Sequence, residues 1–127
     1  MRYWKAMPVI CCSLLLTLAG CAVIPGTQST YSDTKSTTPR VYSSKLERSL
    51  AAKCVIKNID ERLGIMIASL NPEGPRPNVL EVRGRGEVGF AAIIEIETTD
   101  GGSTITTWIS NHYPSKGTLT NRITEGC

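Results

Sequence analysis

The feature that most constrains the fold is the N-terminal segment, because its pattern removes about the first twenty residues from any folded domain. Basic Arg2 and Lys5 precede an apolar stretch from Ala6 to Leu18, and the small residues Ala19 and Gly20 follow. These are the three parts of an export signal. The apolar stretch is too short to span a bilayer. What remains of the 127 residues is enough for one compact domain at most.

A four-residue box, Leu18-Ala19-Gly20-Cys21, closes this signal. Through this box the chain resembles the bacterial lipoproteins, whose signal is cut by signal peptidase II before the cysteine. The resemblance covers residues 1–21. It implies cleavage between Gly20 and Cys21, a diacylglyceryl thioether on the Cys21 sulfur and usually acylation of the new amino group. The alternative is an ordinary secretory signal that happens to contain a cysteine.

The lipid would make a membrane the first partner of the chain. Two or three acyl chains are enough for stable anchoring, so the protein is expected to stay on the periplasmic side of its membrane. In the family pattern, Asp after the lipidated cysteine favours the inner membrane. Ala22 stands there, so we expect the outer membrane rather than the inner one.

The segment after Cys21 has the composition of a linker. Residues 22 to about 42 are rich in Ser, Thr, Gly and Pro and lack apolar periodicity, which predicts a flexible tether. The chain thus divides into a signal peptide (1–20), a lipidated cysteine with its Ser/Thr-rich tether (21–43) and a small disulfide-stapled domain (44–127).

The charge of the chain excludes one class of partner. Its formal net charge is +3, and Arg2 and Lys5 of the signal contribute two of these charges, which leaves about +1. The other basic residues are interspersed with acidic ones. We therefore expect no binding to nucleic acid.

The domain is expected to begin with a helix. Ser44-Lys45-Leu46-Glu47 has the form of a capping box, in which the serine accepts from the third-residue amide and the glutamate reaches back. Apolar residues then recur at three- and four-residue spacing and form one broad face. The residues of this face are Leu46, Leu50, Ala51, Cys54, Val55, Ile59 and Leu63. Gly64 can adopt the left-handed conformation that ends the helix.

The rest of the domain predicts strands. A loop at 71–77 contains three prolines and can be neither helix nor inner strand. Alternating side chains and a turn at 99–102 predict an antiparallel arrangement. Strands are expected at 79–83, 90–98 and 103–110, with a short one possible at 65–69. The predicted fold class is α+β, with one N-terminal helix packed on a small antiparallel β-meander of three to four strands.

The polar, turn-rich tail from 111 to 127 completes the domain, and residues 119–124 are compatible with a helical turn or an edge strand. After cleavage and lipidation, the two remaining cysteines are Cys54 and Cys127. Two cysteines in an oxidising periplasm predict one disulfide, although two separate thiols or an intermolecular bond from Cys127 are alternatives. Because the helix pattern places Cys54 on the buried face, we expect Cys54→Ala to be more destabilising than Cys127→Ala.

A glycine-rich motif in the chain has two interpretations. Gly84-Arg85-Gly86-Glu87-Val88-Gly89 matches the spacing of dinucleotide-binding loops. That chemistry needs a helix to start there, whereas the residues that follow are β-branched and alternating. The motif therefore predicts a hairpin turn or a bulge.

Two further groups of residues bear on catalysis. His112 is the only histidine, and a zinc site with Cys54 and Cys127 would lack a close-spaced ligand pair, so we expect no metal and no cofactor. Glu95 and Glu97 share a strand face, as glycosidase carboxylates do. Exposed cross-strand ion pairs with residues of the neighbouring strand are the favoured interpretation. The residues expected across from them are Glu81, Arg83, Arg85 and Glu87. With no catalytic motif, we expect the chain not to be an enzyme.

The candidate partner-binding residues are Trp108, Tyr113, Ile93 and Arg85. If Ile105 and Ile109 face the helix, Trp108 points to the other side of the sheet, beside Ile93, and forms a small apolar patch. Trp and Tyr are enriched in binding hot spots, and Arg85 belongs to the glycine-rich turn. Alternatively, the C-terminal tail folds back towards Cys54 and covers this patch.

The anchor, the tether and the small domain together predict a protein-interaction or assembly component of the cell envelope, in a secretion, pilus or outer-membrane complex. The alternative is an inhibitor or immunity-type lipoprotein that blocks an envelope-degrading enzyme. Its inhibitory element would be the Pro-rich loop at 71–78 or the turn at Arg85.

Overall fold

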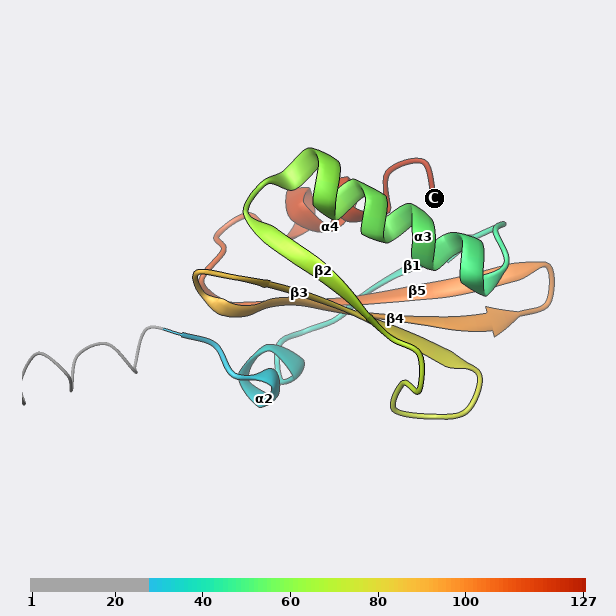
Figure 1. Cartoon of the computed structure of the whole chain (residues 1–127), viewed down its shortest axis with the longest axis horizontal. Helices are drawn as coiled ribbons and strands as arrows, with labels where there is room; N and C mark the ends of the chain where they lie inside the picture. Colours follow the sequence, from blue (N-terminus) through green and yellow to red (C-terminus); the bar gives the residue numbers. More distant parts are fainter. Residues whose placement is uncertain (1–27) are drawn as a thin grey trace, which may run out of the picture.

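The computed structural model describes residues 28–127, which form one sheet with helices on both faces (Figure 1). The five strands are antiparallel and lie in the order β1-β5-β4-β3-β2. They are β1 Arg40–Ser44, β2 Met66–Asn71, β3 Val79–Gly86, β4 Gly89–Thr99 and β5 Gly102–Ile109. The helices are α2 Tyr31–Lys35, α3 Arg48–Asn58 with its π-helical continuation η3 Ile59–Leu63, and α4 Lys116–Thr124.

The predicted fold class is wrong. The sheet has five strands instead of three to four, and the long helix is not N-terminal, since α2 and β1 precede it. The prediction also lacked helix α4 near the C-terminus, which packs with α3 on one face of the sheet. Helix α2 lies on the other face (Figure 1). The predicted signal peptide and Cys21 lie outside the residues that the structure describes.

Residues 28–43, which the prediction assigned to the tether, belong to the folded domain, so the domain begins well before residue 44. The capping box predicted at Ser44–Glu47 does not start α3, and a capping box is found at the start of α2 instead. There, Asp33 N donates to Thr30 Oγ1 (3.1 Å), and Thr30 N donates to Asp33 Oδ2 (2.9 Å). Strand β1 follows and pairs with β5 along its whole length. Ser44 lies in β1, and α3 is instead capped by Glu47, whose carboxylate accepts from Leu50 N (3.2 Å).

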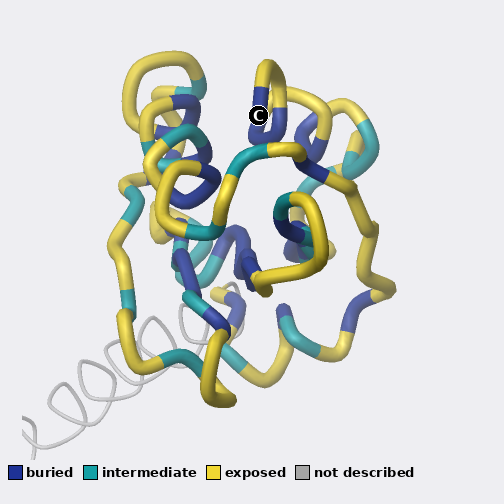
Figure 2. The backbone as a smooth tube through the Cα atoms, turned by 90° about the vertical axis from the view of Figure 1, so that its right-hand side faces the viewer, coloured by how far each residue is buried: buried dark blue, intermediate teal, exposed yellow. Residues whose placement is uncertain are grey.

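The core lies between the sheet and the helices α3 and α4. Figure 2 shows buried backbone gathered in the interior, with exposed segments at the periphery. The buried apolar residues of α3, α4 and the inner strand faces form one cluster. Ile105 and Ile109 belong to it, as predicted, but Leu50 is 50 % exposed, so the predicted apolar face of the helix was too broad. Gly64 ends η3 in the left-handed conformation, which confirms the predicted stop.

The glycine-rich motif forms the hairpin between β3 and β4. Gly86 pairs with Gly89, and the register shifts between Gly84 and Arg85, as at a β-bulge. Strand β4 follows directly, so the motif lacks the helix that a dinucleotide-binding loop needs. The prediction of a hairpin turn or bulge is confirmed.

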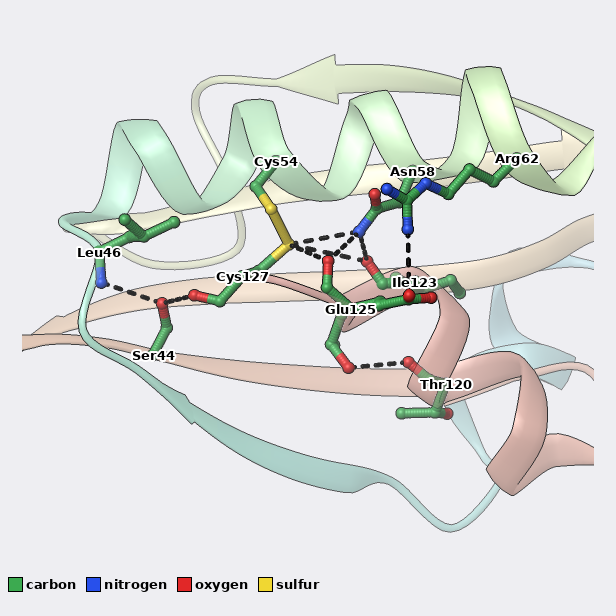
Figure 3. The surroundings of a disulfide bond; sticks show 10 residues. Ser44, Leu46, Cys54, Asn58, Arg62, Thr120, Ile123, Glu125 and Cys127 are labelled. Atoms are coloured by element: carbon green, nitrogen blue, oxygen red, sulfur yellow. Dashed lines mark hydrogen bonds and ion pairs between the residues drawn. A yellow bond between two sulfur atoms is a disulfide. The ribbon is translucent and has the colours of Figure 1, made fainter.

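A disulfide and a buried asparagine attach α4 to α3 (Figure 3). The sulfur atoms of Cys54 and Cys127 are 2.06 Å apart. One turn further along α3, the Asn58 amide donates to the carbonyls of Ile123 (2.9 Å) and Glu125 (2.9 Å). Asn58 is 4 % exposed. It therefore satisfies carbonyls at the end of α4 that otherwise have no intrahelical donor.

Asn58→Ala should lower the free energy of unfolding by about 2 kcal/mol, because two carbonyls lose their donor and unsatisfied buried groups cost about 1–3 kcal/mol. Urea denaturation followed by circular dichroism measures this change. Asn121→Ala, at an exposed position of α4, is the matched control and should change stability little. Equal effects of the two substitutions would contradict the role given to Asn58.

Candidate functional site: a groove beside the β3–β4 hairpin

Two adjoining hollows form a groove at the end of the sheet where η3 meets β2. The larger has a volume of about 550 Å³ and the smaller about 360 Å³. They share Gly64, Ile65 and Glu87. The remaining lining residues are Asp60, Met66, Ile67, Arg85, Gly86, Val88 and Tyr113. The groove thus combines the η3–β2 turn, the β3–β4 hairpin and the segment after β5.

Close backbone packing brings these segments together. A Cβ atom on Gly86 would lie 2.3 Å from the Ile65 carbonyl oxygen, so only glycine lets the hairpin approach the η3–β2 turn this closely. On the other side of the hairpin, Ser29 N donates to the Val88 carbonyl (2.7 Å), and Phe90 N donates to the Ser29 carbonyl (3.0 Å). The N-terminal end of the described chain therefore holds the hairpin in place.

The groove has an apolar mouth with charges at its sides. Ile67 is 75 % exposed and Ile65 is 46 % exposed. The Arg85 guanidinium lies 4.5 Å from the centre of the Phe90 ring, which orients this cation. Arg85 forms no ion pair with the acidic residues between 28 and 127. Burial, followed by the charge of Glu87, raises the pKa of Tyr113, so its phenol stays a neutral hydrogen-bonding group. Such a surface suits a peptide or protein segment with apolar side chains.

The four predicted partner-binding residues fall into two separate places. Arg85 and Tyr113 line the groove. Trp108 and Ile93 are cross-strand neighbours on the face that α2 covers. Ile93 is fully buried, so it cannot touch a partner, and Trp108 is half-buried beneath Lys35. The alternative that the C-terminal tail covers the Trp108 patch is also wrong, because α4 packs on the opposite face and α2 provides the cover (Figure 1).

Beneath α2 lies a charged network that sequence reasoning took for exposed ion pairs. Glu81 and Glu95 are directly opposed on β3 and β4 and are 1 % and 5 % exposed. Lys35 Nζ lies 2.5 Å from Glu95 Oε2 and 4.1 Å from the centre of the Trp108 ring. Two like charges side by side on a sheet repel each other. Cations and donors from α2, β2, β3 and the loop between β2 and β3 balance this repulsion; in that loop, Arg76 Nη2 lies 3.8 Å from Glu95 Oε1.

Glu81 has the more complete set of partners. It accepts hydrogen bonds from the Tyr31 hydroxyl, from Arg83 Nε (2.6 Å) and from Asn71 Nδ2 (3.3 Å). Burial by itself raises the pKa of Glu81, but these hydrogen bonds and the Arg83 charge outweigh it, so the pKa is below its ordinary value. Burial and the bond to Glu81 raise the pKa of Tyr31 to about 12. Glu81 is therefore a permanent carboxylate that holds α2, and a general acid would need the opposite shift.

His112 belongs to a small polar cleft that the sequence did not predict. Its Nδ1 lies 3.0 Å from Ser29 Oγ and 3.1 Å from Ser110 Oγ, and the two hydroxyl oxygens are 2.5 Å apart. Ser110 Oγ also accepts from His112 N (3.2 Å), as in a local turn. The structure gives no hydrogen bond from Asp33, which also lines this cleft, to His112. The hydrogen bonds among Ser29, Ser110 and His112 attach the N-terminal segment to the end of β5.

Within residues 28–127, no three His, Cys, Asp or Glu side chains gather in a way that could hold a metal ion. In the same part of the chain, no helix has the length and apolar character needed to cross a membrane. Comparison with protein-family models, curated proteins and solved structures finds nothing that matches the chain.

Proposed function

We propose that the chain is a lipid-anchored envelope protein whose domain binds a protein partner in the groove beside the β3–β4 hairpin. The observation that carries the proposal is the exposure of Ile67 (75 %) at the mouth of the groove. Ile65 and Arg85 continue this surface. Exposed apolar side chains beside a hollow are typical of protein-binding sites. The anchor rests on the Leu18-Ala19-Gly20-Cys21 box, and Ala22 supports the outer membrane.

The anchor is tested by Cys21→Ser. We expect the variant to lose both signal cleavage and the lipid, because no other cysteine of the chain follows a Leu-Ala-Gly sequence. Metabolic labelling with a palmitate analogue, together with the intact mass of the purified chain, measures both. Label retained on the variant would refute lipidation at Cys21.

Partner binding is tested by cross-linking the acylated protein in membranes and comparing Ile67→Asp with Leu50→Asp. Both substitutions place a charge on an exposed apolar position, but Leu50 lies in the first turn of α3, at the other end of the helix from the groove. A partner recovered with the wild type and with Leu50→Asp, but lost with Ile67→Asp, is the expected result. A partner pattern that is unchanged by Ile67→Asp, or the absence of any reproducible partner, would contradict the proposal.

One observation favours the inhibitor as a second candidate. The Pro-rich loop between β2 and β3 is exposed and yet tied by its own backbone, since Gly74 N donates to the Asn71 carbonyl (3.3 Å) and Val79 N to the Arg76 carbonyl (3.3 Å). Arg76 is also held by Glu97 (3.4 Å). A pre-ordered exposed loop is what an inhibitor offers to an enzyme cleft. A panel of muramidases and amidases that all keep full activity would eliminate this candidate.

A further inference from the structure

The two outer edges of the sheet differ in their protection. At β2, the N–H of Ala68 donates to the Asp60 carboxylate (3.1 Å), so a side chain from η3 occupies a backbone donor of that edge. At β1, no hydrogen bond outside the β1–β5 ladder reaches a backbone group of Val41, Tyr42 or Ser43 from anywhere in residues 28–127. Strand β1 therefore presents unpaired donors and acceptors that another strand can join.

The side chains along β1 are apolar at the centre and basic at the ends. Val41 is 68 % exposed and Tyr42 is 39 % exposed. Arg40 begins the strand and Lys45 follows it, and neither takes part in an ion pair within the described part of the chain. Neither β1 nor its neighbour β5 contains an acidic residue. The edge thus has positive charge that its own sheet does not balance.

These charges argue against a second copy of the chain as the occupant of this edge. If β1 strands of two copies paired antiparallel with Tyr42 at the centre, Arg40 of one copy would lie opposite Ser44 of the second copy and next to its Lys45. Like charges that are close across two strands are destabilising. Among the described helices, α2 packs on one face of β4 and β5 and α4 on the other (Figure 1). Helix α4 reaches β1 at the Arg40 side chain, which lies against Gly117.

We infer that β1 accepts an extended, acidic segment of a partner protein as an additional strand. Backbone hydrogen bonds along β1 supply affinity that is independent of sequence, and the side chains supply specificity. Because side chains alternate between faces, acidic residues of the added strand lie beside Arg40 and an apolar residue lies beside Val41. This edge is opposite the β2 groove in the strand order, so the inference does not depend on the proposed function.

The test uses the full chain in detergent and two synthetic peptides, one of alternating glutamate and valine and one of alternating lysine and valine. Amide hydrogen exchange measured by mass spectrometry reports which strand each peptide protects. We expect the glutamate–valine peptide to slow exchange in residues 40–44 and to leave residues 66–71 unchanged. Arg40→Glu should weaken binding of this peptide by about fivefold, since it turns an attractive cross-strand pair into a repulsive one.

Val41→Lys and Leu70→Lys form a matched pair for the same experiment, because both residues are exposed and apolar on opposite edge strands. Val41→Lys should weaken peptide binding, and Leu70→Lys should leave it intact. Equal protection by both peptides, protection of residues 66–71, or no protection at all would overturn the inference. Slower exchange of residues 40–44 at high protein concentration without peptide would also overturn it, in favour of a second copy. None of these outcomes affects the cross-linking test of the groove.

Discussion

Loss of the Cys54–Cys127 bond should lower the free energy of unfolding by about 4 kcal/mol, because the unfolded chain regains the entropy of an open loop. The bridge joins residues with a sequence separation of 73. For a domain of this size the melting temperature should fall by roughly 15 to 30 °C, at roughly 4 to 8 °C for each kcal/mol. Thermal unfolding of the full chain with and without reductant, followed by circular dichroism, measures the shift.

The control is the double variant Cys54→Ala with Cys127→Ala, whose melting temperature should not respond to reductant. The two single variants should differ less in stability than the helix pattern predicted. Cys127 is 8 % exposed, whereas Cys54 is only partly buried at the margin of the core. Cys127→Ala should therefore be at least as destabilising as Cys54→Ala. A wild-type protein with the same melting temperature in reductant would show that the bridge does not stabilise the domain.

Glu81→Ala is expected to destabilise the domain by roughly 3 kcal/mol, the lower end of the cost of breaking a buried ion pair. The substitution removes the acceptor of Tyr31, Arg83 and Asn71 at once. Helix α2 then keeps the ion pair of Lys35 with Glu95 and the hydrogen bond from Thr34 Oγ1 to the Phe90 carbonyl. Glu97→Ala is the matched control, because Glu97 lies on the same sheet face but is exposed, and surface pairs contribute about 1 kcal/mol or less. Urea denaturation distinguishes the two variants, and equal losses would contradict the role of Glu81.

The same network makes stability depend on pH in a defined direction. The pKa of Glu81 is lowered in the folded state from its ordinary value of 4.5, so its stabilising effect is complete above that value and is lost as the pH falls through the depressed one. The hydrogen bonds from Thr30 also lower the pKa of Asp33, which adds to the loss over the same acidic range. Between pH 5 and 3, unfolding experiments should therefore show a shallower fall in stability for Glu81→Gln than for the wild type.

The sequence predicted the regular part of the sheet well, because strands β3, β4 and β5 are close in the chain and joined by glycine-containing turns. The patterns in 79–83, 90–98 and 103–110 lie within the observed strands or within one residue of them. In β4 the alternation is partly hidden, since Ile93 and Ile94 are both fully buried. The reason is that α2 covers one face of this strand and α3 the other.

The sequence pattern did not predict helix α2 and strand β1, because both are short and are stabilised by residues far away in the chain. The hydroxyl of Tyr31 contacts Glu81, and Lys35 contacts Glu95, across 50 and 60 positions. Ser- and Thr-rich segments of this kind have the composition of linkers. The two usable signals were the Thr30-Tyr31-Ser32-Asp33 capping box and the adjacent β-formers Val41 and Tyr42. The groove escaped prediction because it combines three separate segments.

The folded domain begins close to Cys21 in the sequence, which limits how far from the membrane a lipid-anchored form of the protein can extend. Only residues 22–27 separate Cys21 from Gln28, and a chain of that length spans at most about 25 Å when fully extended. The Gln28 side chain donates to the Glu87 carbonyl (3.4 Å), so the chain enters the domain at the hairpin that lines the groove. With lipid on Cys21, the groove therefore stays close to the bilayer surface. A partner anchored in the same leaflet meets it at a high effective concentration, an advantage that a freely diffusing periplasmic protein lacks.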